Sequence, residues 1–344
     1  AEPSPMLQAM PDMVHTECRI DRPMIRKGWL DDGPVGNATG RAVDPFVAVP
    51  WDETLDIAAA ELDRIRTEHG NEAFYAASGW GSAGTFHSAE TQLKRFFNDI
   101  GGFVDQVTNY SFGAASVIVP RVTGSMEPVL RPTSLPGIIE NTKLMVAFGG
   151  ISPKNSQVSK DGIGRHETQD WLREANARGV ELVQISPVRD DFLNELKVEW
   201  LAALPNTDVA VMIGLAHTLV VEDLQDEDFL AKYCVGFDRF RAYLMGEADG
   251  VPKDADWAAE ISGIDASTLR GLARRMAAVR TMISMSWSIQ RCDHGEQPCW
   301  MAITLAATLG QIGLPGGGIG IGYGSNATIG APAAKMPSVG LARG

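Results

Sequence analysis

The spacing of apolar residues predicts two helices and a short strand between residues 52 and 100. The first helix begins at Asp52 and ends at Gly70, because apolar residues recur every three or four positions between them. Residues 74–77 form a short and mostly apolar run, which predicts a buried strand. This run is followed by the glycine-rich turn 78–84. The second helix begins near Phe86.

Strands and helices alternate from residue 143 onward. Continuous apolar runs predict strands, and apolar residues at helical spacing predict helices. The predicted strands are 143–148, 180–185 and 280–286, and the predicted helices are 168–177, 207–221, 266–279 and 297–309. Such alternation implies right-handed crossovers, so we expect an α/β fold built on doubly wound, mostly parallel sheets. Ligands of these folds bind outside the carboxyl ends of the strands.

The two ends of the chain have a different character. Residues 1–50 are rich in Pro, Gly and Asp and are expected to be irregular. Residues 314–344 contain many Gly, Ala, Pro and Ser residues and predict a connection rather than a closing element. The sequence also begins without Met, so both ends indicate a partial enzyme. We therefore expect four segments, which are 1–50, 51–140, 141–313 and 314–344.

Composition and charge exclude several classes of protein. The chain has 344 residues, of which 44% are hydrophobic and 21% charged, so it is not a disordered chain. Its net charge of −13 argues against nucleic-acid binding, because phosphate contacts need Lys and Arg. No apolar stretch reaches the roughly 20 residues of a membrane span. The four cysteines form no C-x-x-C pair, so the ligand set of an iron–sulfur cluster is not seen.

Several predicted strands run into small or glycine-rich turns, at 78–84, 149–150, 186–187 and 286–288. Glycine lets a ligand approach the backbone, and a helix N-terminus beyond the turn favours a phosphate. None of these turns has the Walker A pattern or a G-x-G-x-x-G before a helix. Residues 314–320 are similar to the second pattern but follow a helix, which favours a flexible connection. Several such turns at one sheet edge indicate one large phosphate-bearing cofactor.

Four blocks of the chain share a more specific pattern. Residues 109–115 read Asn-Tyr-Ser-Phe-Gly-Ala-Ala and precede Val119-Pro120, and Trp80 lies 31 residues before Ser111. The other blocks are 286–291 with 294–297, 309–318, and 233–237 with 263–266. Together these blocks resemble the molybdenum oxidoreductases of the dimethyl sulfoxide reductase family. The block at 233–266 is similar to the trimethylamine N-oxide reductase branch in particular.

This resemblance implies a molybdenum ion held by the dithiolenes of two molybdopterin guanine dinucleotides and by one protein oxygen. By position that metal ligand is Ser111, in segment 51–140, and Trp80 lies over the metal; these two are the expected catalytic residues. A serine oxygen is a hard ligand that suits an oxophilic metal, whereas Cys would supply a softer thiolate. Without the other blocks, Ser111 would instead be interpreted as a serine of a turn or of a helix N-cap.

The resemblance also implies a set of cofactor-binding residues, mostly in segment 141–313. They are Gly149, Gly150, Ser186, Asp208, Trp287, Gln290, Arg291, His294 and Gln297. Arg291 would supply the cation beside a pyrophosphate, and Asp208 would accept hydrogen bonds from a guanine. Two alternatives stay open, since Asp208 also suits a helix N-terminus and His294 also suits a polar position before a helix. Segment 314–344 would lead toward a C-terminal domain.

The implied activity is removal of oxygen from an amine N-oxide by oxygen-atom transfer, with a sulfoxide reductase as the alternative. A nucleotide-dependent dehydrogenase and an inactive, cofactor-free fragment are alternatives of other classes. The resemblance further implies a small N-oxide or S-oxide substrate and electrons from a c-type cytochrome. It implies a periplasmic location, with the cytoplasm as the alternative. We expect no iron–sulfur cluster, no nucleic-acid partner and no membrane span.

Overall fold

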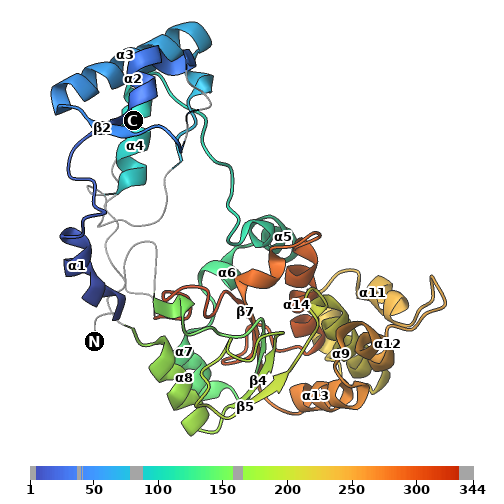
Figure 1. Cartoon of the computed structure of the whole chain (residues 1–344). Coiled ribbons are helices and arrows are strands. Elements are labelled where there is room, and N and C mark those ends of the chain that lie inside the picture. The colour runs from blue at the N-terminus through green and yellow to red at the C-terminus, as the bar shows by residue number, and fades with distance from the viewer. Residues whose placement is uncertain (1–4, 37–39, 41, 78–87, 158–165, 333–344) are drawn as a thin grey trace. The chain divides into compact units, whose positions relative to one another are not determined.

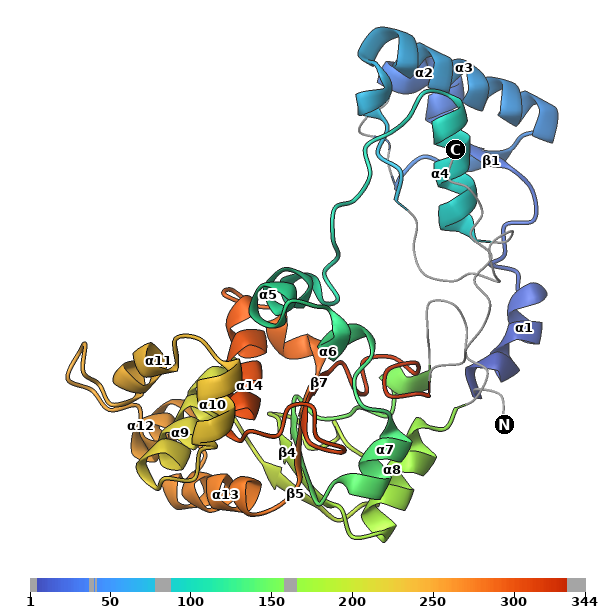
Figure 2. The ribbon, with the colours of Figure 1, turned by 180° about the vertical axis from the view of Figure 1, so that it is seen from behind.

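A computed structural model describes residues 5–36, 40, 42–77, 88–157 and 166–332, and the chain divides after Gln106 into two compact units. Figures 1 and 2 show the elements of each unit. The N-terminal unit contains α1 (Met10–Val14), β1 (Met24–Arg26), α2 (Lys27–Gly36), β2 (Phe46–Ala48), α3 (Trp51–His69) and α4 (Ala89–Asp99). The C-terminal unit contains α5 (Gly113–Thr123), α6 (Glu127–Leu130), α7 (Leu135–Asn141), β3 (Leu144–Phe148), α8 (Thr168–Ala177), β4 (Glu181–Ile185), β5 (Val198–Leu201), α9 (Asp208–Val221), α10 (Glu227–Tyr233), α11 (Phe237–Leu244), α12 (Ala255–Ser262), α13 (Ala266–Ala278), β6 (Thr281–Met285), α14 (Glu296–Thr308) and β7 (Gly318–Ile321).

Helices α3 and α4 of the N-terminal unit confirm the two predicted helices. The prediction of a strand at 74–77 is wrong. Within the described residues, that segment forms one isolated parallel bridge, between Tyr75 and Val104. The Val104 N–H donates to the Phe74 carbonyl at 2.7 Å, and the Ala76 N–H donates to the Val104 carbonyl at 3.2 Å. Phe74 and Ala76 are buried, whereas Tyr75 is 63% exposed and Ala77 is also exposed. The run is therefore only half-buried, and it pairs with one residue instead of with a full strand.

The first 50 residues contain more regular structure than their composition predicts. Strands β1 and β2 pair antiparallel, with Ile25 opposite Val47, and two short helices accompany them. Each strand is three residues long, which is too short for an alternating pattern to be visible in the sequence.

The C-terminal unit is built on a five-stranded sheet in the order β5-β4-β3-β6-β7, with every pair parallel. Figures 1 and 2 show α7 and α8 on one side of this sheet and α9, α13 and α14 on the other. All five residues of β3 and of β6 are buried, as expected for central strands covered on both faces. The expected α/β fold with a doubly wound parallel sheet is confirmed.

Two strands of this sheet were absent from the sequence prediction. Strand β5 is partly exposed and has no continuous apolar run. Strand β7 lies in the stretch expected to be a glycine-rich connection, yet Tyr323 just after it is fully buried. A Cβ on Gly320 would lie 2.3 Å from the Tyr323 ring, so this glycine makes room for a core aromatic residue. Residues 333–344 lie outside the described part of the chain.

Candidate functional site

The strand order creates a switch point at the carboxyl edge of the sheet. The chain leaves β3 toward β4 and β5 and then returns to the other side of β3 through β6 and β7. Open parallel sheets bind ligands in the crevice at such a point. Here β3 ends before Gly149 and β6 ends before Ser286, so the turns singled out in the sequence meet at this edge.

Gly149 and Gly150 adopt positive φ angles of 75° and 70°. A Cβ on Gly149 would lie 2.3 Å from Ser286 Oγ, and a Cβ on Gly150 would lie 2.3 Å from the Asp191 carbonyl oxygen. Contacts within the protein therefore require both glycines. Asp191 lies in the loop after β4 and was not predicted from the sequence.

Ser186 follows β4 and is buried, and its hydroxyl is engaged within the protein. Ser186 Oγ donates to the Asp191 carboxylate at 2.8 Å and accepts from the Val188 N–H at 3.2 Å. The Ser186 carbonyl accepts from the Trp200 indole N–H at 2.8 Å. These bonds fix the loop after β4 at the same edge as Gly150.

Ser111 lies in the turn directly before helix α5 and is half-buried. Its carbonyl oxygen accepts hydrogen bonds from Gln290 Nε2 and from Arg291 Nε, both at 3.3 Å. Its hydroxyl forms no hydrogen bond with any other described residue. The turn is thus held through its backbone while the side-chain oxygen stays available to a ligand. Trp80, the other expected catalytic residue, lies outside the described residues.

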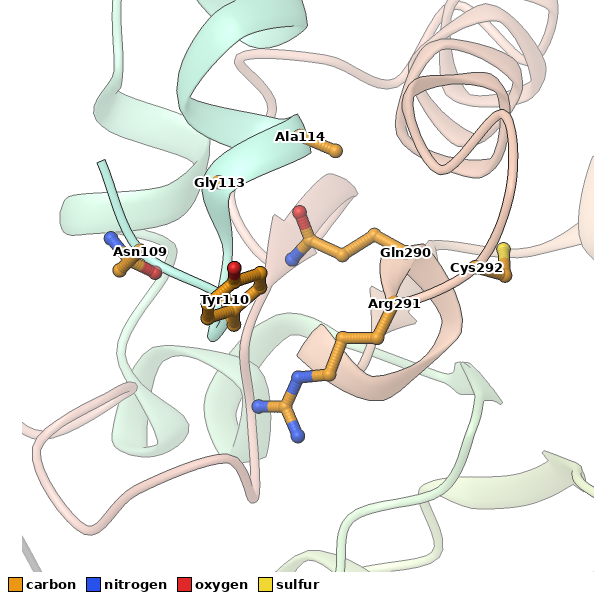
Figure 3. Close-up of a pocket in the computed structure, with 7 residues that line it drawn as sticks. All are labelled: Asn109, Tyr110, Gly113, Ala114, Gln290, Arg291 and Cys292. Carbon is orange, nitrogen blue, oxygen red and sulfur yellow. The ribbon is translucent and has the colours of Figure 1, made fainter. Parts of the chain in front are cut away.

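A cavity of about 320 Å³ opens beside this turn. Figure 3 shows the side chains of Gln290 and Arg291 approaching it from the segment after β6. The lining residues are Asn109, Tyr110, Gly113, Ala114, Gln290, Arg291 and Cys292. Arg291 is exposed, and no carboxylate among the described residues pairs with it. Cys292 was not predicted from the sequence as a site residue. Its position next to Arg291 is the sequence feature that could have indicated it.

Trp287, two residues after β6, packs against Phe112, the residue before α5. Their ring centroids are 4.6 Å apart, and Trp287 is 5% exposed. The Trp287 backbone N–H donates to Ser325 Oγ at 3.0 Å. The indole Nε1, however, is buried and has no partner among the described residues. An unpaired buried N–H is costly, which favours a bound group that accepts its hydrogen bond.

Asp208 begins helix α9, and its carboxyl is partly buried. Burial raises the pKa of this carboxyl to about 6. Burial first, and then the negative charge of Asp208, raise the pKa of the Cys292 thiol. That electrostatic effect indicates that Asp208 lies near Cys292, which lines the cavity.

His294 and Gln297 stand apart from these residues at the exposed start of α14. The His294 side chain is 78% exposed, and its imidazole lies 3.7 Å from the Asp293 carboxylate. Gln297 Nε2 donates to the neighbouring Glu296 carboxylate at 3.1 Å. Within the described residues, the side chains of both form hydrogen bonds or ion pairs with residues close to them in sequence, and neither lines the cavity.

These features fit an anionic cofactor that brings metal ligands of its own. The unpaired Arg291 suits a pyrophosphate, and the buried Trp287 N–H suits an acceptor. No group of three or more His, Cys, Asp or Glu side chains is placed to hold a metal in the described part of the chain. In the described ranges, no helix is long and apolar enough to cross a membrane.

Comparisons with known proteins agree with this fit. The Molybdopterin oxidoreductase family model matches residues 19–340. The chain is 44% identical to biotin sulfoxide reductase of Cereibacter sphaeroides, over 96% of this chain and 45% of the relative. It is 45% identical to trimethylamine-N-oxide reductase 1 of Escherichia coli strain K12, over 93% of this chain and 39% of the relative.

The fold of this chain is also similar to that of a solved structure. Acetylene hydratase from Pelobacter acetylenicus aligns with a TM-score of 0.58 at 21% identity, over 88% of this chain and 37% of that chain. The chain spans less than half the length of the curated relatives given above. Since the family model covers nearly all of the sequence, the chain belongs to the molybdopterin oxidoreductase family.

Proposed function

We propose that the chain provides part of the active site of a molybdenum reductase that removes oxygen from an amine N-oxide. The observation that carries this proposal is the half-buried Ser111, whose hydroxyl has no partner in the described residues while its backbone is held at a cavity. Relatives named trimethylamine-N-oxide reductase, at 45% identity, support the choice of substrate class.

The cofactor we propose is molybdenum carried by two molybdopterin guanine dinucleotides. The chemistry it supplies when bound is two-electron oxygen-atom transfer: the N–O bond of R₃N–O breaks to give R₃N, and two electrons and two protons complete a water molecule. Ser111 Oγ would bind the metal, and Trp80 would lie over it. Arg291 would bind a pyrophosphate oxygen, and the indole N–H of Trp287 would donate to the pterin.

The other predicted contacts belong to the same proposal. Asp208 would accept N–H bonds from a guanine. Gly149, Gly150 and Ser186 would shape the edge of the sheet next to one dinucleotide. His294 and Gln297 would contact the cofactor from the start of α14. We further propose a c-type cytochrome as electron donor, a periplasmic location and no iron–sulfur cluster in this part of the enzyme.

A sulfoxide reductase is the second candidate, because biotin sulfoxide reductase is 44% identical over 96% of the chain. The ratio of kcat/KM for trimethylamine N-oxide to that for biotin sulfoxide separates the two. A ratio well above one supports the N-oxide reductase, and a ratio well below one supports the sulfoxide reductase.

The role of Ser111 is tested with Ser111→Ala in protein loaded with the cofactor. Removing one metal ligand is expected to abolish turnover while the circular dichroism spectrum stays unchanged, because the Ser111 side chain forms no hydrogen bond with another described residue. The control is Ser116→Ala, which removes a serine hydroxyl from the following helix (bonded there to the Gly113 carbonyl) and is expected to retain turnover. Full turnover in Ser111→Ala would contradict the proposal.

The role of Arg291 is tested by elemental analysis of molybdenum. Arg291→Ala removes a charge-assisted contact of about 1.5–3 kcal/mol, so molybdenum content is expected to fall by roughly ten- to a hundredfold when cofactor is limiting. Arg178→Ala removes another exposed arginine, which pairs with Glu174 on α8, and it is expected to load normally. Equal loading of the two variants would assign Arg291 a structural role only.

A further inference from the structure

Helix α5 begins without a cap from its own sequence. Its N-cap residue, Phe112, offers no side-chain acceptor, although the first N–H groups of a helix lack intrahelical partners. The Ala115 N–H, at the third helical position, instead donates to Gln290 Oε1 at 2.7 Å. This is the position that an N-cap side chain ordinarily serves. The cap of α5 is thus supplied by a residue 175 positions further along the chain.

The other end of the same carboxamide holds the preceding turn. Gln290 Nε2 donates to the Ser111 carbonyl at 3.3 Å, and Arg291 Nε donates to the same oxygen at 3.3 Å. Gln290 is 4% exposed and Ala115 is fully buried, so water competes little for these bonds. One planar group therefore spans the turn from residue 111 to residue 115.

We propose that Gln290 is a positioning residue, which fixes the peptide of Ser111 so that its hydroxyl faces a bound group. This inference rests on the proposed role of Ser111 and adds how that residue is held. Rotation of the Ser111 peptide would break the bond from Nε2 and pull against the bond to Ala115. The Ser111 hydroxyl takes no part in this clamp, so the backbone is fixed while the ligand atom remains available.

A glutamine carboxamide suits this task because it donates and accepts in one plane. Glutamate would keep the acceptor for Ala115 but would bring a carboxylate to the Ser111 carbonyl in place of the donor. Leucine would lose both bonds. The two substitutions therefore separate the cap of the helix from the hold on Ser111.

Gln311 provides a matched control at the opposite end of β6. It is also buried, its Oε1 accepts from the Thr281 N–H at 2.8 Å, and its Nε2 donates to the Val279 carbonyl at 2.9 Å. Gln311→Leu therefore removes a similar pair of bonds without touching the Ser111 turn. Any general loosening of the fold appears in both leucine variants.

The experiment measures hydrogen–deuterium exchange of the Ala115 amide by NMR. In Gln290→Leu we expect exchange about tenfold faster, as for loss of one buried hydrogen bond, whereas Gln290→Glu and Gln311→Leu stay within about twofold of the parent. An unchanged Ala115 rate in Gln290→Leu would overturn the inference. So would an equal acceleration in Gln311→Leu.

A second readout uses protein loaded with the cofactor. Because Gln290→Glu and Gln290→Leu both lose the donor to Ser111, both are expected to lower kcat more than tenfold while KM changes little. Unchanged kcat in both variants, beside an inactive Ser111→Ala, would overturn the positioning role and leave the proposed function intact. If instead Ser111→Ala keeps full turnover, the proposed function fails, and the exchange rate of Ala115 alone decides whether Gln290 holds the turn.

Discussion

Replacing Asp208 with asparagine tests how strongly the sheet edge disfavours a buried negative charge. Burial raises the pKa of this carboxyl from 3.8 to about 6, and no cationic side chain of the described residues offsets that effect. The folded protein therefore binds this proton more tightly than the unfolded chain does. The contribution of Asp208 to stability is most favourable below about pH 4 and falls as the pH rises toward 6, because the unfolded carboxyl ionises first.

The size of the effect follows from the two pKa values. Their difference corresponds to about 3 kcal/mol at about 1.4 kcal/mol per pKa unit. This is an upper value, because the Asp208 side chain keeps some contact with solvent. Asparagine has nearly the same shape and no charge, so Asp208→Asn is expected to stabilise the protein by about 1.6 kcal/mol at pH 5 and up to about 3 kcal/mol at pH 8.

The assay is urea unfolding at both pH values, with the midpoint converted through the measured slope. Asp170→Asn is the control, since Asp170 is an exposed first-turn residue of α8 that pairs with Arg173. Its effect is expected to stay within about 1 kcal/mol at either pH. A stability gain for Asp208→Asn that is the same at pH 5 and pH 8, or a loss at pH 8, would refute the reasoning.

Two further predictions concern the core of the C-terminal unit. Gly150→Ala is expected to destabilise it by more than about 2 kcal/mol, because the new Cβ would overlap the Asp191 carbonyl at a positive φ. In Gly179→Ala the φ is also positive but the space is open, so thermal unfolding should show a smaller loss of about 1–2 kcal/mol. Tyr323→Phe removes the bond from the buried phenol to the Thr133 carbonyl at 2.6 Å, and urea unfolding is expected to show a loss of about 1–3 kcal/mol. A fully stable Tyr323→Phe protein would contradict a net stabilising contribution from this hydrogen bond.

Local pattern was sufficient for the fold class and for most central elements. Strands β3, β4 and β6 are apolar runs because both faces of the sheet are covered, and α8 matches its predicted range of 168–177. The period of apolar residues depends on nearby positions only, so it can be read from sequence. The blocks around Ser111 and Trp287 likewise identified the family that the comparisons support.

The tertiary structure decided the features that depend on contacts between residues far apart in the sequence. Strand β7 is rich in glycine, yet it pairs in parallel with β6, and Gly320 leaves room for the buried ring of Tyr323. The family resemblance predicts Gln290 as a cofactor contact. The hydrogen bonds of its side-chain carboxamide to Ser111 and Ala115 could not be predicted from the sequence. Those partners lie 179 and 175 positions away, and a buried amide bonds with whichever group the fold brings to it. Sequence thus determined the three central strands β4, β3 and β6, whereas packing determined the two outer strands and which polar groups at the sheet edge are already paired.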